Sequence, residues 1–149
     1  MVSSPPTRAA IEARLPHRDP FLFVDRVISE TAGSIQTEWD VPADLDLFRG
    51  HFPARPVLPG VIICESAFQS AALLVYRPDS GAVSGTPVLV KIEESRFKRI
   101  VAPGETLTAN VELDEQLKNA CYFSAKLRTK EGLVARLKFV LALVDEEGA

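Results

Sequence analysis

Polar and apolar residues alternate along much of the chain, and this alternation predicts several strands. In residues 34–41, Ile35, Thr37, Trp39 and Val41 fall on one face, and the residues between them are polar. A period of two is typical of a strand that is buried on one side. Four later segments also predict strands, at residues 88–101, 106–113, 120–129 and 133–144. Short connections between these four favour antiparallel neighbours.

The central part of the chain has a different pattern. Residues 45–60 contain three prolines within seven positions and predict an irregular segment. Residues 59–76 then predict one long helix that is apolar on almost every face, with Pro59 at its first helical position. A helix that is apolar all round belongs in the interior of a protein.

The first thirty residues are less regular. Residues 7–15 predict a short helix that has Thr7 as its N-cap and ends before Pro16. Residues 20–28 predict a strand or an extended arm. The segments 1–6 and 145–149 have the composition of frayed ends. We expect a single α+β domain over residues 1–149, in which a curved antiparallel sheet wraps around the long buried helix.

Composition limits what this domain does. The chain has 149 residues, 17 of them basic and 20 acidic, and 46% are hydrophobic. One domain of this length forms a core without disulfides or metals. The slight acidity argues against nucleic-acid binding, and no apolar run reaches the ~18 residues of a membrane span. Two cysteines without framework spacing and no recognisable signal peptide favour a cytoplasmic location.

His51 is the first residue that suggests chemistry. It lies in the proline-rich segment between Gly50 and Phe52. Stiff surroundings hold a general base in place, and an unperturbed histidine accepts a proton near neutral pH. The alternative is an ordinary loop histidine that is bonded to the backbone.

Glu65 is the second such residue, because it is a carboxyl on an otherwise apolar helix. An unpaired carboxyl in apolar surroundings takes up a proton, which is the state that a general acid needs. Gln69, one turn later, is placed to hydrogen-bond to it. The alternative is a narrow solvent-facing stripe in which Glu65 lies with Ser66, Gln69 and Ser70.

The N-terminus of the same helix supplies a third component. The N–H groups around Gly60 and Val61 have no partner within the helix and carry partial positive charge, so they suit a carbonyl oxygen that becomes an enolate. Glu65 follows about five residues later, roughly 7–8 Å along the axis. A substrate of modest size therefore reaches both groups.

Two other features have simpler interpretations. His17, the only other histidine, is expected to be structural. Arg96, Lys98 and Arg99 form a basic cluster, which indicates either a solvated edge or a surface that attracts an anionic partner. The sequence contains no phosphate-binding glycine loop, no nucleophile elbow and no metal-ligand spacing.

Three blocks of sequence occur in a fixed order between residues 15 and 105. They are LPHRDPFLFVDR at 15–26, GHFP and RPVLPGV at 50–61 followed by Glu65, and RFKR at 96–99 followed by Pro103-Gly104. Together these blocks resemble the (3R)-hydroxyacyl-[acyl-carrier-protein] dehydratases of the FabZ type. The resemblance implies a hot-dog fold and a homodimer, often assembled further into a trimer of dimers. It also implies that the histidine and the acid of each site come from different subunits.

The resemblance assigns a role to each candidate. His51 is expected to take the α-proton, Glu65 to protonate the departing hydroxyl, and the N–H groups of Gly60 and Val61 to hold the thioester carbonyl. The reaction is dehydration of a (3R)-hydroxyacyl chain on acyl carrier protein to the trans-2-enoyl product in fatty-acid biosynthesis. No metal or organic cofactor is expected. Glutamate rather than aspartate at position 65 favours dehydration without isomerisation of the double bond.

The resemblance also assigns the surroundings of the site. The docking surface for the acidic carrier protein is expected at Arg96, Lys98 and Arg99. Residues of an apolar acyl tunnel beside the helix are expected to include Phe52, Pro59, Phe68 and Gln69. Two other hypotheses remain open, a non-catalytic hot-dog module that binds acyl thioesters or the carrier protein, and a hot-dog acyl thioesterase.

Overall fold

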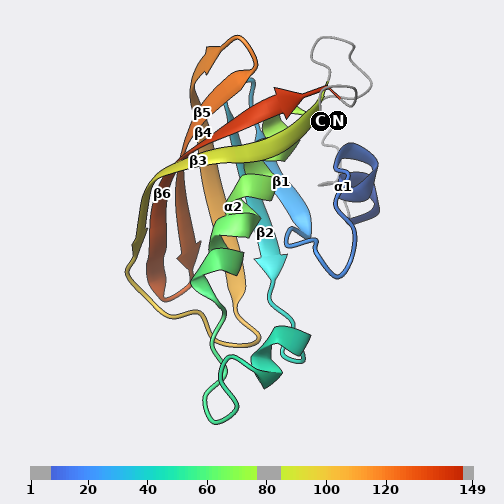
Figure 1. Ribbon diagram of the computed structural model, residues 1–149. Coiled ribbons are helices and arrows are strands. Elements are labelled where there is room, and N and C mark those ends of the chain that lie inside the picture. Colours follow the sequence, from blue (N-terminus) through green and yellow to red (C-terminus); the bar gives the residue numbers. More distant parts are fainter. Residues whose placement is uncertain (1–7, 77–84, 146–149) are drawn as a thin grey trace.

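The computed structural model of the protein describes residues 8–76 and 85–145. A curved sheet wraps around one long helix, as Figure 1 shows. In chain order the elements are α1 (Arg8–Arg14), β1 (Arg26–Glu30), β2 (Ser34–Asp40), the 3-10 helix η1 (Asp46–Arg49), α2 (Gly60–Val75), β3 (Thr86–Phe97), β4 (Thr106–Leu117), β5 (Ala120–Thr129) and β6 (Gly132–Val144).

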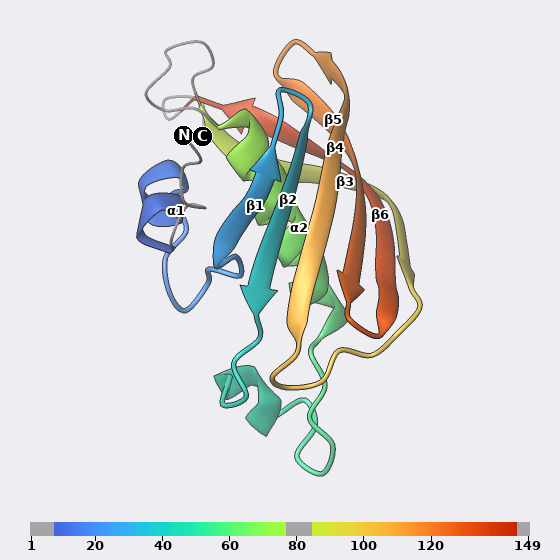
Figure 2. The same ribbon diagram turned by 180° about the vertical axis from the view of Figure 1, so that it is seen from behind.

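The sheet has the order β1-β2-β4-β5-β6-β3, and every neighbouring pair is antiparallel. In Figure 2, which shows the molecule from behind, the sheet lies in front of α2. Strands β1 and β3 are its two edges. This is the α+β hot-dog architecture, so the predicted fold class is confirmed. No helix among residues 8–76 and 85–145 is long and apolar enough to cross a membrane.

The alternating strands bury the faces that the sequence predicts. Ile35, Thr37 and Trp39 of β2 are buried, and so are Phe123 and Leu127 of β5. These side chains pack with α2, whose residues from Ile63 to Val75 are buried apart from Glu65. Burial of both the apolar face of the sheet and the helix accounts for the core.

The polar residues of α2 also face inwards. Ser66 and Ser70 are 1% and 0% exposed. The Ser66 hydroxyl donates to the Phe23 carbonyl at 2.9 Å, and the hydroxyls of Ser70 and Thr37 are 2.7 Å apart. The hypothesis of a solvent-facing stripe is therefore wrong, because these hydroxyls find partners in the N-terminal arm and in β2.

Several boundaries differ from the sequence predictions. Of the stretch 20–28, residues 21–25 run as the extended arm against α2, and β1 begins at Arg26 and continues to Glu30. Strand β3 ends at Phe97, and the Lys98 N–H that follows makes one more bond to β6, at the Val134 carbonyl. Pro59 is the N-cap of α2 and not its first helical residue. The Thr7 cap and the segments 1–6 and 146–149 lie outside the described residues.

Candidate active site

His51 is held by a backbone bond on one side of its ring. Its Nδ1 lies 2.9 Å from the Val57 carbonyl oxygen, and the Val57 N–H returns a bond to the His51 carbonyl at 3.0 Å. A carbonyl only accepts hydrogen bonds, so Nδ1 must carry the proton of the neutral ring. Nε2 then keeps its lone pair. His51 is therefore bonded to the backbone, as the alternative hypothesis expects. The same bond leaves Nε2 able to accept a proton.

Glu65 is a carboxyl in largely apolar surroundings. Its side chain is 21% exposed. Burial raises the pKa of the Glu65 carboxyl, and a hydrogen bond from Gln69 opposes part of that rise. A carboxyl with a raised pKa retains its proton at a pH where ordinary carboxyls have lost theirs, as a general acid requires.

Gln69 determines which oxygen of Glu65 carries that proton. Its Oε1 accepts the Phe23 N–H at 2.8 Å, and its Nε2 donates at 3.1 Å both to the Phe21 carbonyl and to Glu65 Oε2. Turning the amide over would break the bonds to Phe21 and Phe23, so its orientation follows from the network. Because Oε2 accepts from Gln69, the proton of neutral Glu65 lies on Oε1.

The N-terminus of α2 presents two N–H groups. The N–H groups of Ile62 and Ile63 donate to the Pro59 carbonyl, but those of Gly60 and Val61 have no acceptor among the described residues. A Cβ added at Gly60 would lie 3.1 Å from the Phe97 ring. A side chain at position 60 would therefore require the Phe97 ring to shift, whereas glycine leaves the first N–H groups of the helix available to a carbonyl oxygen beside that ring.

A cavity of about 240 Å³ adjoins Glu65. Glu65 and His17 supply its polar groups, and apolar residues make up the rest of the lining, among them Phe21, Phe68, Ala72, Val88, Leu89 and Leu141. Of the four predicted tunnel residues, Phe68 lines this cavity and Gln69 is buried behind Glu65. Phe52 stacks on His51 with ring centroids 4.1 Å apart, and Pro59 caps α2.

The structure also brings His17 to the acid, which the sequence analysis missed. His17 Nε2 is 3.9 Å from Glu65 Oε2, and its ring stacks on Phe21. Burial lowers the pKa of His17 and favours its neutral form. The signal was present in the sequence, because His17 belongs to the first of the three ordered blocks.

The predicted base and acid have separate surroundings. Among the described residues, His51 bonds to Val57 and stacks on Phe52, whereas Glu65 bonds to Gln69 and faces His17. No hydrogen bond or ion pair within residues 8–76 and 85–145 joins His51 to Glu65.

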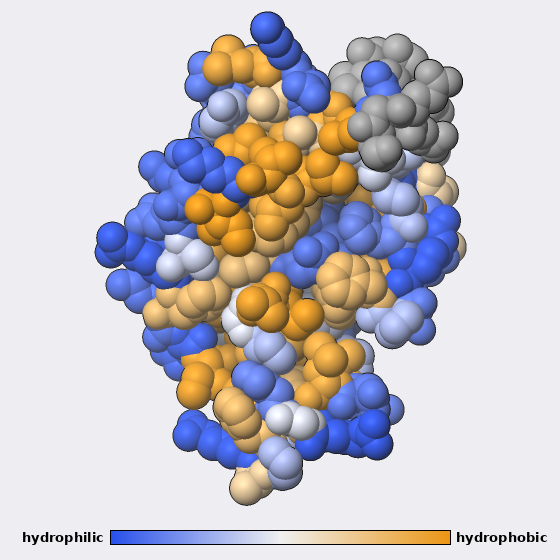
Figure 3. Space-filling view, in the orientation of Figure 1, coloured by the Kyte–Doolittle hydropathy of each residue, from blue (hydrophilic) through white to orange (hydrophobic). Residues whose placement is uncertain are grey.

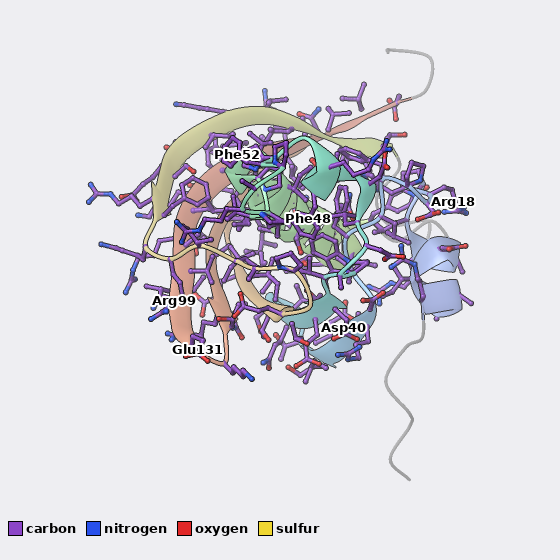
Figure 4. All side chains as sticks on the ribbon, turned by 90° about the horizontal axis from the view of Figure 1, so that it is seen from below. Arg18, Asp40, Phe48, Phe52, Arg99 and Glu131 are labelled. Atoms are coloured by element: carbon purple, nitrogen blue, oxygen red, sulfur yellow. The ribbon has the colours of Figure 1, made fainter. Side chains whose placement is uncertain are left out.

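The predicted basic residues lie at the end of β3 and directly after it. Arg96 forms an ion pair with Glu94 at 2.8 Å. Arg99 lies on the same side of the sheet as Glu131, at the turn between β5 and β6, as Figure 4 shows. Lys98 follows β3 and is exposed.

Strand β3 is a long edge with apolar residues on its surface. Val88, Leu89, Val90, Ile92 and Phe97 are 39–57% exposed. Figure 3 shows hydrophobic side chains gathered across the middle of the face that carries β3 and α2. An unpaired apolar edge is a site where another chain pairs with a sheet.

Comparison with known proteins agrees with this fold. Residues 27–138 match the family model of ApeI-like proteins, described as ApeI dehydratase. The fold also resembles the dehydratase heterocomplex ApeI:P from Xenorhabdus doucetiae, with a TM-score of 0.75, 18% identity and 93% of each chain covered. A second solved structure, the uncharacterized protein PH1136 from Pyrococcus horikoshii, has a TM-score of 0.69 at 22% identity and covers 97% of each chain. The protein is thus a dehydratase of the hot-dog fold.

Curated relatives indicate which kind of dehydratase the chain resembles. The 3-hydroxyacyl-[acyl-carrier-protein] dehydratase FabZ of Rickettsia canadensis (strain McKiel) is 38% identical over 133 residues, which cover 89% of this chain and 93% of the relative. FabZ of Rickettsia massiliae (strain Mtu5) is also 38% identical, over 89% of this chain and 92% of its own. The chain belongs to the family of FabZ and ApeI-like dehydratases.

Proposed function

We propose that this dehydratase converts (3R)-3-hydroxyacyl groups on acyl carrier protein to trans-2-enoyl groups, as a step of fatty-acid or related acyl biosynthesis. The observation that carries the proposal is the state of Glu65. Its carboxyl is half-buried, its pKa is raised, and the bond from Gln69 leaves the proton on Oε1. That is an acid prepared to protonate a departing hydroxyl.

The remaining steps use the other groups of the site. Nε2 of His51 takes the α-proton, and the electron pair of that C–H bond forms the new double bond. The C–O bond at the β-carbon breaks, and the hydroxyl leaves as water with the proton from Glu65. The N–H groups of Gly60 and Val61 hold the thioester oxygen while it carries enolate charge.

We place each site between two copies of the chain, with His51 from one and Glu65 from the other. Two observations support this arrangement. The two side chains have no common contact among the described residues. Strand β3 offers an unpaired apolar edge beside the cavity that Val88 and Leu89 line. Pairing of two such edges buries apolar surface and satisfies the backbone of both strands.

Lys98 and Arg99 are proposed to attract the acidic carrier protein, together with Arg96. Exposed cations increase the rate of encounter with a negatively charged partner.

The test is a hydration assay with trans-2-enoyl thioesters of increasing chain length, which is followed through the loss of enoyl absorbance. We expect hydration by the full chain, and at least about a hundredfold loss of rate in His51→Ala and in Glu65→Gln. Glu115→Gln, an exposed position on β4, is the matched control. Release of free thiol would indicate a thioesterase instead. Binding without turnover at every chain length would indicate a non-catalytic module.

A further inference from the structure

His17 lies in the cavity of the acid, and the mechanism above does not use it. Its Nε2 faces Glu65 Oε2 at 3.9 Å, beyond hydrogen-bond distance. Its Nδ1 is buried and has no hydrogen-bond partner within residues 8–76 and 85–145. A polar atom that is buried without a partner costs free energy, so this ring orientation calls for a compensating interaction elsewhere.

The unpartnered Nδ1 indicates where the ring proton lies. A buried N–H without an acceptor is rarer than a buried acceptor without a donor. The neutral ring of His17 therefore carries its proton on Nε2, the nitrogen that faces Glu65. Nε2 is a donor aimed at a carboxyl oxygen.

Both donors near Glu65 approach the same oxygen. Gln69 Nε2 donates to Oε2 at 3.1 Å, and His17 Nε2 faces that oxygen from the N-terminal arm. Oε1 carries the acidic proton, so neutral Glu65 presents only a weak acceptor to His17. When Oε1 gives up its proton, the negative charge spreads over both oxygens and Oε2 becomes a strong acceptor.

We propose that His17 is a positioning residue that donates a second hydrogen bond to Glu65 as Glu65 protonates the departing hydroxyl. This inference rests on the proposed function. In the step, the C–O bond breaks, the hydroxyl takes the proton from Oε1, and the electron pair of that O–H bond stays on Glu65. The carboxylate is then held by the N–H groups of His17 and Gln69, while His17 itself neither gains nor loses a proton.

The long distance in the free protein is part of the argument. An interaction accelerates a reaction only when it is stronger in the transition state than in the ground state. Catalytic hydrogen bonds that are long in a free enzyme shorten when substrate reacts. A contact of 3.9 Å that shortens as charge develops on Oε2 meets that condition.

The experiment compares three substitutions of His17 in the full chain. His17→Phe keeps an aromatic ring without a donor. His17→Gln places an amide N–H near the position of Nε2, whereas the shorter side chain of His17→Asn reaches only that of Nδ1. We expect kcat to fall about tenfold in His17→Phe and His17→Asn with little change in KM, and to recover largely in His17→Gln.

The pH profile separates this role from simple packing. Loss of a donor to the carboxylate raises the pKa of Glu65, so the alkaline limb of kcat moves to higher pH in His17→Phe and His17→Asn and stays in place in His17→Gln. Among the described residues, His17 shares the cavity with this carboxyl and Cys64 interacts with it electrostatically, whereas β3 and β6 contribute apolar residues to the cavity. Phe21→Leu alters the same cavity without removing a donor. We expect this variant to change KM and to keep the alkaline limb of kcat at the wild-type pH.

A second measurement does not depend on turnover. NMR titration of the Glu65 carboxyl carbon, with Glu65→Gln to assign the signal, is expected to show a higher pKa in His17→Phe and His17→Asn than in the wild type. An unchanged pKa together with a wild-type alkaline limb would overturn the role of His17. Equal loss of kcat in all three variants would indicate packing only and would also overturn it. Failure of the wild type to hydrate any enoyl thioester would overturn the proposed function. The NMR titration of Glu65 would then still test the contact between His17 and Glu65.

Discussion

Gln69 donates a hydrogen bond to Glu65 through an amide that cannot turn over, because its oxygen is occupied by the Phe23 N–H. The same amide nitrogen also bonds to the Phe21 carbonyl. One wholly buried side chain therefore sets the hydrogen bonding of the acid and anchors the N-terminal arm to α2.

Replacement of Gln69 with leucine is expected to cost about 3 kcal/mol in the free energy of unfolding. The Phe23 N–H and the Phe21 carbonyl would remain buried without partners, and each such group costs about 1–3 kcal/mol. Urea unfolding measures the change. Gln116→Leu, at an exposed position on β4, is the control and should differ from wild type by less than about 0.5 kcal/mol. Equal losses in the two variants would contradict the anchoring role of Gln69.

Glu65 is expected to make stability depend on pH. Burial raises its pKa in the folded protein above the value in the unfolded chain. The folded state therefore holds this proton more tightly. The associated stability is fully present below the unfolded pKa and is lost as pH rises through the folded pKa.

Glu65→Gln cannot lose a proton, so its stability relative to wild type should increase across that pH window. Urea unfolding of both proteins over a series of pH values tests this expectation, with Glu115→Gln as a control for loss of one surface charge. Parallel stability curves for Glu65→Gln and wild type would show that the carboxyl has no raised pKa.

Gly60→Ala is expected to disturb the N-terminus of α2. The new Cβ would lie 3.1–3.2 Å from two atoms of the Phe97 ring, so the ring or the helix must shift. We expect a loss of about 1 kcal/mol in stability and about tenfold in hydration rate. Gly33→Ala is the matched control, because no atom lies within 4 Å of its added Cβ. Recovery of the rate in the double variant Gly60→Ala/Phe97→Leu would identify the contact as the cause, and a double variant as slow as the single one would exclude it.

Mixing two inactive variants tests whether a site is shared between subunits. A mixed dimer of His51→Ala and Glu65→Gln contains one intact site if His51 of one copy acts with Glu65 of the other. Random pairing after co-expression or joint refolding should then restore about a quarter of wild-type activity. If both residues act within one chain, every site in the mixture lacks one of them, and no activity returns.

Charge reversal at Lys98 or Arg99 is expected to raise KM for carrier-bound substrate by roughly tenfold and to leave KM for a small thioester almost unchanged. Arg96→Glu should have a smaller effect, because Glu94 already neutralises Arg96. Steady-state kinetics with both substrates, at low and high salt, provides the measurement. Equal effects on the two substrates would exclude these residues from carrier docking.

Local spacing predicted much of this molecule. Alternation identified β2 and the strands from β4 to β6, and the separation of four residues placed Gln69 beside Glu65. Contacts between distant segments were not predictable in the same way. Phe97 covers Gly60, and His17 faces Glu65 across 48 positions of sequence. Periodicity describes which residues share a face of one element, but not which residue of another segment packs against that face.

The structure shows which part of residues 20–28 takes each of the two predicted forms, since residues 21–25 form the extended arm and β1 begins at Arg26. Residues 20–28 are apolar enough for a strand, but the backbone of Phe21 and Phe23 bonds to Gln69 and Ser66 instead of to a neighbouring strand. Side chains of α2 thus replace a ladder of backbone bonds. The apolar pattern is the same in either arrangement, so the pattern alone does not distinguish them.

The attachment of the arm to α2 also has a consequence for the order of events during refolding. Phe21 and Phe23 are 46–48 positions away from Gln69 in sequence, so the amide acquires its final partners only when the arm docks on α2. Until then Gln69 is free to rotate, and the proton of Glu65 has no preferred oxygen. Dehydratase activity should therefore return later than the far-ultraviolet signal of the sheet and helix, and in step with protection of the Phe23 amide from hydrogen exchange.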